Sequence, residues 1–412
     1  MNTLKKQVLL CTVGSILEWY EFLVFALLTP LISTLFFPNT NHFAAMMSTF
    51  AVFASGYIMR PLGAIFFGHL GDTIGRKYTL VLTLFLMTGS TFAMGCIPVQ
   101  HSFSAIILLI CRLIQGFSAS GEYPAVLTLL AEQAHEKRKG FITSTVPFGT
   151  GIGCALGALL CAMLFHFLGH DGMLQGGWRI PFLLAIPLGY LSYRLREKIN
   201  ESSKFKKLRA EQKHLKSPMM ELIKNHQKTI WIMLPISILA NVIIYVNFLF
   251  VNNYLVAQHK ITTIQSSHLY LWTIVMYSAS ILFFGFLSDY FNKKYCLILA
   301  FITTAVFAYP LCHIIFNDSF DKQFIAQGVL SVLSGMVLGP FVSVLSDGFP
   351  TTVRYSALSI VLNFAGSIFG STAPIICGWL AAYIGPVFAS AGYLIFLSLM
   401  ALFIVVLVAD YV

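Results

Sequence analysis

The sequence predicts an all-α membrane protein in which twelve transmembrane helices form two pseudo-symmetric six-helix halves. The 412-residue chain is 57% hydrophobic and only 10% charged, whereas about 25% of the residues in an average soluble domain are charged. A soluble fold could not bury this much apolar surface, so we expect lipid to cover it. Polar motifs that recur about half a chain apart indicate that the two halves arose by internal duplication.

Runs of about 20 apolar residues are long enough to cross the hydrocarbon core of a bilayer. Twelve such spans are expected, at 9–36, 43–69, 79–97, 103–131, 141–168, 179–194, 229–256, 266–288, 295–316, 323–346, 355–383 and 386–409. The sixth span is short, and the eleventh runs into the twelfth. The spans divide the chain into an N-terminal half at 1–194, a polar connector at 195–228 and a C-terminal half at 229–412.

The distribution of basic residues predicts the orientation of these spans. Of the 26 Lys and Arg residues, 21 fall in the N-terminus and in the loops on the same side of the membrane. The excess of basic residues on one side predicts that both termini and the connector are cytoplasmic, in a cytoplasmic (inner) membrane. The net charge of +10 is therefore an orientation signal, and we expect no nucleic-acid partner. The basic connector either lies along the membrane surface or binds anionic lipid.

Two polar motifs are each found in both halves. The loop at 68–77, G-H-L-G-D-T-I-G-R-K, returns at 285–294 as G-F-L-S-D-Y-F-N-K-K, with Asp72 and Asp289 217 residues apart. The segments that follow Ala131 and Ser346 form the second pair, each with an acidic residue followed by a basic one. Such charges at helix ends can pair between neighbouring helices. We expect a gate on the cytoplasmic face formed by Asp72, Arg76, Lys77, Asp289, Glu132, Arg138, Asp347 and Arg354.

Five ionisable residues lie within the predicted spans of the N-terminal half: Glu18, Glu21, Arg60, Arg112 and Glu122. Such residues are costly in a bilayer, so each suggests a functional site. At about 1.5 Å per helical residue, Arg112 can meet Glu18 and Glu21 near the midplane, and Arg60 can pair with Glu122. The carboxylates are candidate proton carriers, Glu21 first, because Arg does not release its proton. The alternative is a static ion-pair network that only holds the helices together.

The C-terminal half offers neutral polar residues in place of charges. Asn241, Tyr245, Asn247 and Asn363 are candidates for one wall of a solute site, and Arg60 and Arg112 are candidates for holding a carboxylate. The eight cysteines are scattered singly, so no disulfide framework or metal site is expected. No nucleotide-binding loop or hydrolase motif is present in the sequence. We therefore expect neither an enzyme nor a cofactor other than the proton.

Several motifs resemble the major facilitator superfamily, and in particular its metabolite:proton symporter branch, which includes proline/betaine, α-ketoglutarate, citrate and shikimate carriers. The matching segments are L-E-W-Y-E-F at 17–22, R-P-L-G at 60–63, G-D-T-I-G-R-K at 71–77, R-L-I-Q-G-F-S-A-S-G-E-Y at 112–123, K-R-K-G-F at 137–141, G-W-R-I-P-F at 177–182, F-P-T-T-V-R-Y-S at 349–356 and G-S-T-A-P at 370–374. The sequence departs from the family pattern at Glu21, where an Asp is usual, and at 250–255, where F-V-N-N-Y-L replaces a segment that often holds Pro and Thr.

The resemblance implies proton-coupled import, by alternating access, of a small organic acid or zwitterion such as proline, betaine or a di- or tricarboxylate. The expected partners are the solute, protons and membrane lipids, with anionic lipid at 195–228, and the chain is expected to act as a monomer. Two alternatives remain open: a proton-driven exporter, and a non-transporting sensor or receptor on the same scaffold.

Overall fold

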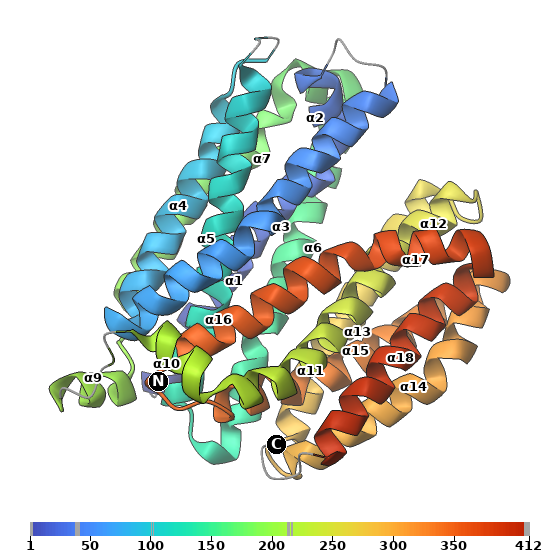
Figure 1. Ribbon diagram of the computed structural model, residues 1–412. Helices are drawn as coiled ribbons and strands as arrows, with labels where there is room; N and C mark the ends of the chain where they lie inside the picture. Colours follow the sequence, from blue (N-terminus) through green and yellow to red (C-terminus); the bar gives the residue numbers. More distant parts are fainter. Residues whose placement is uncertain are drawn as a thin grey trace.

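The computed structural model describes residues 3–37, 42–99, 101, 103–211, 215 and 217–407, and the regular elements in these ranges are all helical. Two bundles of helices lie side by side and lean together at one end (Figure 1). The start of α1 and the end of α18 lie at that end, which we call the terminal face. Residues 408–409 of the last predicted span, and the parts of the three predicted segments that fall on 1–2, 38–41, 100, 102, 212–214, 216 and 408–412, lie outside the described residues.

The first six spans precede the connector. Their helices are α1 (Thr3–Leu27) with α2 (Thr29–Phe36), α3 (His42–Thr73), α4 (Arg76–Cys96), α5 (Ser104–Gln133), α6 (Lys139–Gly172) with η2 (Met173–Gly177), and α7 (Arg179–Leu183) with α8 (Ala185–Glu197). Eleven helical segments among the described residues are each long and apolar enough to cross a membrane. The sixth span is divided between α7 and α8, but backbone hydrogen bonds of Leu184 to Ile180 and of Leu188 to Leu184 make it continuous.

The connector and the last six spans follow in the same style. The connector holds α9 (Ser203–Ala210) and α10 (Pro218–Asn225). The spans are α11 (Gln227–Tyr245) with η3 (Val246–Val251) and α12 (Asn252–Ala257), α13 (Thr263–Leu287), α14 (Lys293–Asn317), α15 (Phe320–Asp347), α16 (Arg354–Phe364) with η4 (Ala365–Gly370) and α17 (Ser371–Ile384), and α18 (Pro386–Leu407). Gly385, with φ at 80°, and Pro386 separate the eleventh span from the twelfth, because a left-handed glycine ends a helix and a proline starts one.

The motif at 68–77 is not a loop over most of its length. Helix α3 continues to Thr73 and α4 begins at Arg76, so Asp72 lies in the last turn of α3. The chain reverses within two residues because Gly75 adopts a φ of 134°, which a residue with a Cβ atom rarely adopts. The expectation of a ten-residue loop was wrong, and the motif is a helix–turn–helix corner.

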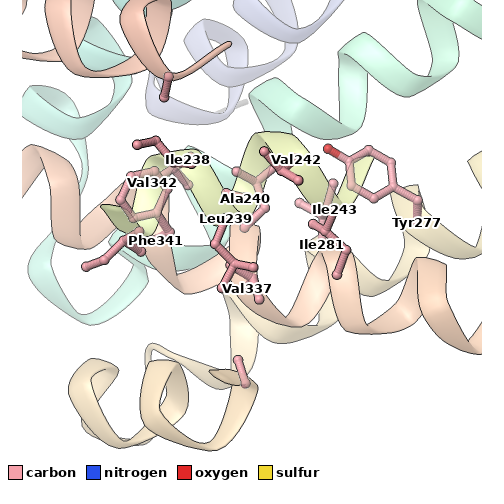
Figure 2. Packing of buried hydrophobic residues seen from close by; sticks show 14 of the residues in the cluster. Ile238, Leu239, Ala240, Val242, Ile243, Tyr277, Ile281, Val337, Phe341 and Val342 are labelled. Atoms are coloured by element: carbon pink, nitrogen blue, oxygen red, sulfur yellow. The ribbon is translucent and has the colours of Figure 1, made fainter. Parts of the chain in front are cut away.

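Apolar side chains fill the interior of each bundle and also cover much of its outside. In the C-terminal half, Leu239 of α11, Ile281 of α13 and Val337 of α15 are fully buried against one another (Figure 2). Large apolar side chains such as Ile58 and Phe167 are 72% and 78% exposed. An apolar exterior of this kind is stable in lipid, which agrees with the predicted class of polytopic membrane protein.

The halves pack together through two sets of helices. Helix α16 lies along α3 and α5, and α13 and α15 lie along α6. Glycines permit the closest approaches: a Cβ atom added to Gly140 of α6 would lie 2.4 Å from the carbonyl oxygen of Gly285 in α13. Small residues at crossing points allow membrane helices to touch backbone to backbone.

Candidate functional site

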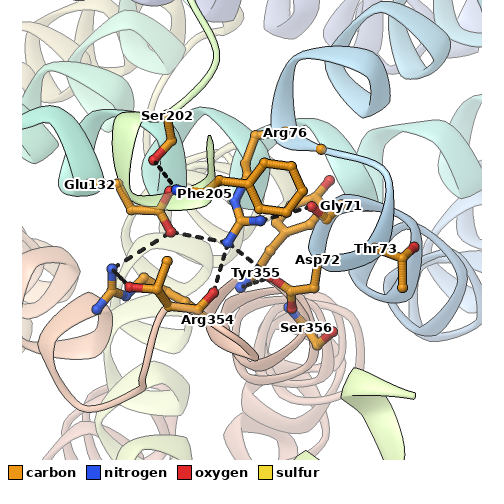
Figure 3. Close-up of polar contacts among 12 residues, drawn as sticks. Gly71, Asp72, Thr73, Arg76, Glu132, Ser202, Phe205, Arg354, Tyr355 and Ser356 are labelled. Atoms are coloured by element: carbon orange, nitrogen blue, oxygen red, sulfur yellow. Dashed lines mark hydrogen bonds and ion pairs between the residues drawn. The ribbon is translucent and has the colours of Figure 1, made fainter. Parts of the chain in front are cut away.

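The first junction between the halves lies where the end of α3 meets the start of α16 (Figure 3). The carboxylate of Asp72 accepts hydrogen bonds from the backbone N–H groups of Tyr355, at 3.3 Å, and Ser356, at 2.8 Å. These N–H groups belong to the first turn of α16, where a helix offers its amides no acceptor of its own. The negative charge also complements the positive end of the helix dipole. Asp72 therefore caps a helix of the opposite half.

A cluster of ion pairs surrounds the buried Arg76 beside this cap (Figure 3). Arg76 Nη2 lies 3.1 Å from Asp72 Oδ1 and 3.0 Å from Glu132 Oε1, and it donates to the Thr351 carbonyl at 2.8 Å. Arg354 approaches the same oxygen of Glu132 at 3.6 Å. Charges of both signs alternate here, which a buried ionic cluster needs in order to be stable. The Glu132–Arg354 and Arg76–Thr351 contacts join the two halves.

A second junction repeats the helix cap with the halves exchanged. Asp289, after α13, accepts hydrogen bonds from the backbone N–H groups of Gly140, at 2.6 Å, and Phe141, at 2.9 Å, in the first turn of α6. Desolvation by burial raises the pKa of the Asp289 carboxyl, against the opposing effect of these two N–H groups. The two copies of the duplicated motif thus perform the same structural task, each on the half to which it does not belong.

The second junction also has an ion-pair cluster, centred on Asp347. This carboxylate pairs with Lys139 of the opposite half and, at 2.8 Å, with Lys293 of its own half. The sequence analysis missed both lysines. Their signal was the internal repeat: Lys293 follows Arg76 by 217 residues, and Lys139 precedes Arg354 by 215.

Most of the residues predicted for the gate meet at these junctions: Asp72, Arg76, Asp289, Glu132, Asp347 and Arg354. Two do not take part in them. Lys77 donates to the Glu197 carbonyl within its own half. Arg138 is exposed, and no ion pair joins it to another residue in the described part of the chain. The place expected for Arg138 is occupied by its neighbour Lys139, whose ammonium reaches Asp347.

A cavity with an empty volume of about 1260 Å³ lies between the two halves. Its wall is formed by α1, α3, α5 and α6 on one side and by α11, η3, α13, α15, α16 and η4 on the other. The segments η3 and η4 are π-helical turns, which occur mostly as single turns at functional sites. The ribbons of the two halves converge toward the terminal face and diverge toward the opposite face (Figure 1).

One acidic and one basic side chain line the cavity, Glu18 and Arg60. Glu18 Oε2 and Arg60 Nε are buried without a hydrogen-bond partner, and neither side chain forms an ion pair within the described ranges. The Arg60 guanidinium carbon lies 4.6 Å from the ring centroid of Phe22 and 4.7 Å from that of Tyr57. Buried charges are stable only when they are compensated. The cavity therefore presents two opposite charges to a ligand that carries both.

Aromatic side chains make up much of the rest of the wall: Trp19, Tyr57, Tyr123, Tyr245, Phe248, Tyr270 and Tyr277. The faces of aromatic rings attract cations, and quaternary ammonium groups in particular are bound in this way. Of these residues, the sequence analysis singled out only Tyr245. A signal was available for two others, because Tyr270 and Tyr277 are seven residues apart and share one face of α13.

The neutral polar residues predicted for the C-terminal wall are divided in their placement. Asn241, Tyr245 and Asn363 line the cavity, and Asn363 Nδ2 also donates to the Ser120 carbonyl of the opposite half at 2.8 Å. Asn247 does not line it. The Asn247 side chain is fully buried and donates to Ser331 Oγ at 2.8 Å, so it holds α15 against the seventh span.

Arg112 and Glu21 lie outside the cavity lining, in the packed interior of the N-terminal half. The Arg112 guanidinium contacts the ring of Phe22, at 4.4 Å, and donates to the side chain of Gln115. Glu21 Oε1 accepts a hydrogen bond from Thr88 at 3.1 Å, while Glu21 Oε2 has no partner among the described residues. Because Phe22 also contacts Arg60, its ring connects the interior Arg112 with the Arg that faces the cavity.

Glu122 pairs with a residue that the sequence analysis assigned to the connector. Arg196, near the end of α8, donates to Glu122 and, at 2.5 Å, to the Leu80 carbonyl. Both side chains are almost completely buried. The expected Arg60–Glu122 pair is not formed, because α8 extends two residues beyond the predicted end of the sixth span and brings Arg196 into the bundle.

The described residues offer no group of three or more His, Cys, Asp or Glu side chains that could hold a metal ion. The eight cysteines are free thiols, and Cys154 lines the cavity.

Comparisons with known proteins agree with this architecture. The sequence model of the Major Facilitator Superfamily matches residues 15–271. The glycine betaine/proline/ectoine/pipecolic acid transporter of Dickeya dadantii is 30% identical, over 97% of this chain and 82% of that protein. The proline/betaine transporter of Escherichia coli K12 is 29% identical, with the same coverage of both chains.

Solved structures share the fold. A proton:xylose symporter bound to 6-bromo-6-deoxy-D-glucose matches with a TM-score of 0.80 at 17% identity, over 99% of this chain and 95% of that one. The human organic anion transporter matches with a TM-score of 0.74 at 14% identity, over 98% of this chain and all of that one.

These relatives are transporters and not enzymes, as predicted for this chain. The predicted resemblance to the metabolite:proton symporter branch is also confirmed, because the named relatives are proline/betaine transporters. The protein is a multi-pass membrane protein and a secondary transporter, with twelve spans in two six-helix halves. The chain belongs to the Major Facilitator Superfamily.

Proposed function

We propose that this transporter imports a small zwitterion together with a proton, by alternating access. The observation that carries the proposal is the pair of uncompensated charges in the central cavity. Glu18 and Arg60 face a space to which both halves contribute, and neither has an ionic partner in the described ranges. A ligand with one carboxylate and one ammonium group would compensate both charges at once, with the carboxylate on Arg60.

The charge of the cavity favours a zwitterion over a di- or tricarboxylate. Arg60 is the only Arg or Lys among the residues that line it, because Arg112 lies in the interior behind Phe22. A second carboxylate would face Glu18 or an aromatic ring and would lose its hydration without compensation. The aromatic wall suits an ammonium group, including a quaternary one. Proline and betaine, which appear in the names of the relatives, have this chemistry.

Glu21 is the proposed proton carrier. It lies one turn beyond Glu18 on α1, is 1% exposed, and has one carboxylate oxygen without a partner. Such a group must be neutral or must gain a cation, so its protonation can respond to the charge placed beside it in the cavity. Glu122 is less suited to this role, because its carboxylate is held by Arg196.

The two junctions support an alternating-access cycle. They join the halves at the terminal face, so they must break before the cavity can open on that side. We propose that the terminal face is cytoplasmic, with both termini inside a cytoplasmic (inner) membrane, because most Lys and Arg residues lie on that side. One chain supplies both walls of the cavity, which supports function as a monomer.

The proposal is tested in proteoliposomes that enclose a pH-sensitive dye. Betaine or proline added outside should acidify the interior, whereas citrate and α-ketoglutarate should not. Arg60→Ala should abolish the signal, and Lys322→Ala, which removes an exposed cation that pairs with Asp318, should leave it unchanged. Acidification by citrate would overturn the zwitterion assignment. Binding of betaine without acidification would indicate a receptor, and proton-driven efflux of betaine would indicate an exporter.

A further inference from the structure

Two basic residues at the terminal face have no role in the junctions. Lys137 and Arg138 precede α6 and are exposed, whereas the next residue, Lys139, is buried and pairs with Asp347. No ion pair involves Lys137 or Arg138 in the part of the chain that the structure describes. Their positive charges are therefore free for a ligand.

Both residues line a groove between the halves. Its empty volume is about 600 Å³, and its other lining residues are Phe141, Phe286, Asp289 and Tyr290. The Asp289 carboxylate is already bonded to the N–H groups of Gly140 and Phe141, so it does not compensate the two cations fully. The formal charge of the lining is +1, and the groove favours an anion.

The groove lies at the level where two membrane spans end. The span of α6 begins at Glu136, and that of α13 ends at Leu287. Three aromatic residues of the groove are exposed: Phe141 by 39%, Phe286 by 46% and Tyr290 by 73%. Aromatic side chains at this depth contact the boundary between lipid headgroups and acyl chains. A soluble anion would use the cations and leave these rings in water, so a molecule with an apolar part fits the site better.

We propose that this groove binds the headgroup of an anionic phospholipid. The phosphate oxygens would accept hydrogen bonds from the Lys137 ammonium and the Arg138 guanidinium, and the acyl chains would pack on Phe286 and Tyr290. Basic pockets between membrane helices bind anionic headgroups in this way. The site is separate from the basic connector at 195–228.

The bound lipid would also favour the closed terminal face. The cations of the groove belong to the N-terminal half, whereas Phe286 and Tyr290 belong to the C-terminal half. The groove therefore exists only while Asp289 caps α6. A ligand that binds one of two conformations shifts the population toward it.

Lipid binding is measured by native mass spectrometry of the purified full-length protein, titrated with phosphatidylglycerol or with phosphatidylcholine of the same acyl chains. Phosphatidylglycerol should bind more tightly. Lys137→Ala/Arg138→Ala should weaken its binding about 30-fold, since each Lys or Arg near an anionic lipid contributes roughly a fivefold gain. Lys204→Ala/Lys206→Ala removes the same charge from exposed positions of α9 and should leave the affinity unchanged. Lys137→Arg/Arg138→Lys should restore it.

Three results would overturn the proposal. The first is equal affinity of the parent and Lys137→Ala/Arg138→Ala for phosphatidylglycerol. The second is an equal loss in Lys204→Ala/Lys206→Ala, which would move the lipid to the connector. The third is displacement by glycerol phosphate at the same headgroup concentration, which would identify a soluble phosphate as the ligand. These measurements need no transport, so they are independent of the solute assignment.

Discussion

Asp72 and Asp289, 217 residues apart, each cap the first turn of a helix in the opposite half: Asp72 caps α16, and Asp289 caps α6. The duplication seen in the sequence thus survives as a pair of reciprocal contacts. Their surroundings differ, because Asp72 also pairs with the buried Arg76, whereas Asp289 is more exposed and has no such partner at hydrogen-bond distance in the described residues. The two caps should therefore contribute unequally to the closed terminal face.

We expect Asp72→Ala to open the terminal face more than Asp289→Ala does. Loss of a helix cap costs about 1 kcal/mol, which is roughly a fivefold change in the ratio of closed to open molecules. Asp72→Ala also removes one of the two carboxylates that compensate Arg76. Spin labels at Tyr78 and Tyr295, both exposed, would report the distance between the halves after replacement of the native cysteines.

The matched comparison is Asp318→Ala, which removes an exposed carboxylate that pairs with Lys322 within the C-terminal half. This variant should leave the distance distribution of the parent unchanged. If Asp72→Ala and Asp289→Ala also leave it unchanged, the caps do not hold the terminal face closed.

Gly71 offers a steric test of the same junction. A Cβ atom at this position would lie 1.7 Å from Cδ1 of Tyr355, so Gly71→Ala should displace α16 and open the terminal face. The control is Gly89→Ala in α4, where an added Cβ atom meets nothing within 4 Å and should stabilise the helix by about 1 kcal/mol. The same pair of spin labels measures both. A closed terminal face in Gly71→Ala would show that the Tyr355 ring can move aside without separating the halves.

The fold was predictable because its signal is long and repeated. Twelve apolar runs and the 217-residue offset specify a duplicated membrane bundle without any knowledge of side-chain contacts. Helix ends were harder, since apolarity stops before the helix does. The extension of α3 to Thr73 and of α8 to Glu197 is decided by polar contacts inside the protein, such as that of Arg196 with Glu122.

The site was predictable in its residue types more than in its pairs. Charged residues within the spans identified Glu18 and Arg60, which face the cavity, but also Arg112 and Glu21, which do not line it. Depth along a helix is known from the sequence, whereas the direction of a side chain depends on the rotation of each helix in the bundle. Asn247 illustrates the limit, because it is six residues from Asn241 on a π-helical turn and faces Ser331 instead of the cavity.

Cys154 can report occupation of the cavity. Its thiol lines the space between Glu18 and the aromatic wall, so a bound zwitterion should slow its reaction with a small maleimide. Arg60→Ala should remove this protection by betaine, because the carboxylate loses its cation. The exposed Cys96 is the internal control, and its rate should not depend on betaine. Equal protection in the parent and in Arg60→Ala would place the carboxylate elsewhere.

Glu21→Gln separates proton coupling from solute movement. The amide keeps the hydrogen bond from Thr88 but cannot exchange a proton. We expect uphill accumulation in proteoliposomes to be lost, while exchange of labelled for unlabelled solute continues. Thr88→Val, which removes the hydrogen bond and keeps the carboxyl group, should retain accumulation. If Glu21→Gln concentrates solute as well as the parent, another group carries the proton.

The Glu122–Arg196 pair can be assigned to structure or to coupling by a double-mutant cycle. Arg196→Met leaves the buried Glu122 without its cation and should destabilise the protein by about 3–5 kcal/mol, whereas Glu122→Gln/Arg196→Met removes both charges and should recover most of this loss. Arg194→Met, which breaks an exposed pair with Glu197, should cost at most about 1 kcal/mol. Thermal unfolding in detergent gives these values. The double variant should still accumulate solute, because in this arrangement Glu122 holds α5 to α8 and exchanges no proton. Exchange without accumulation in a stable double variant would make Glu122 a coupling residue.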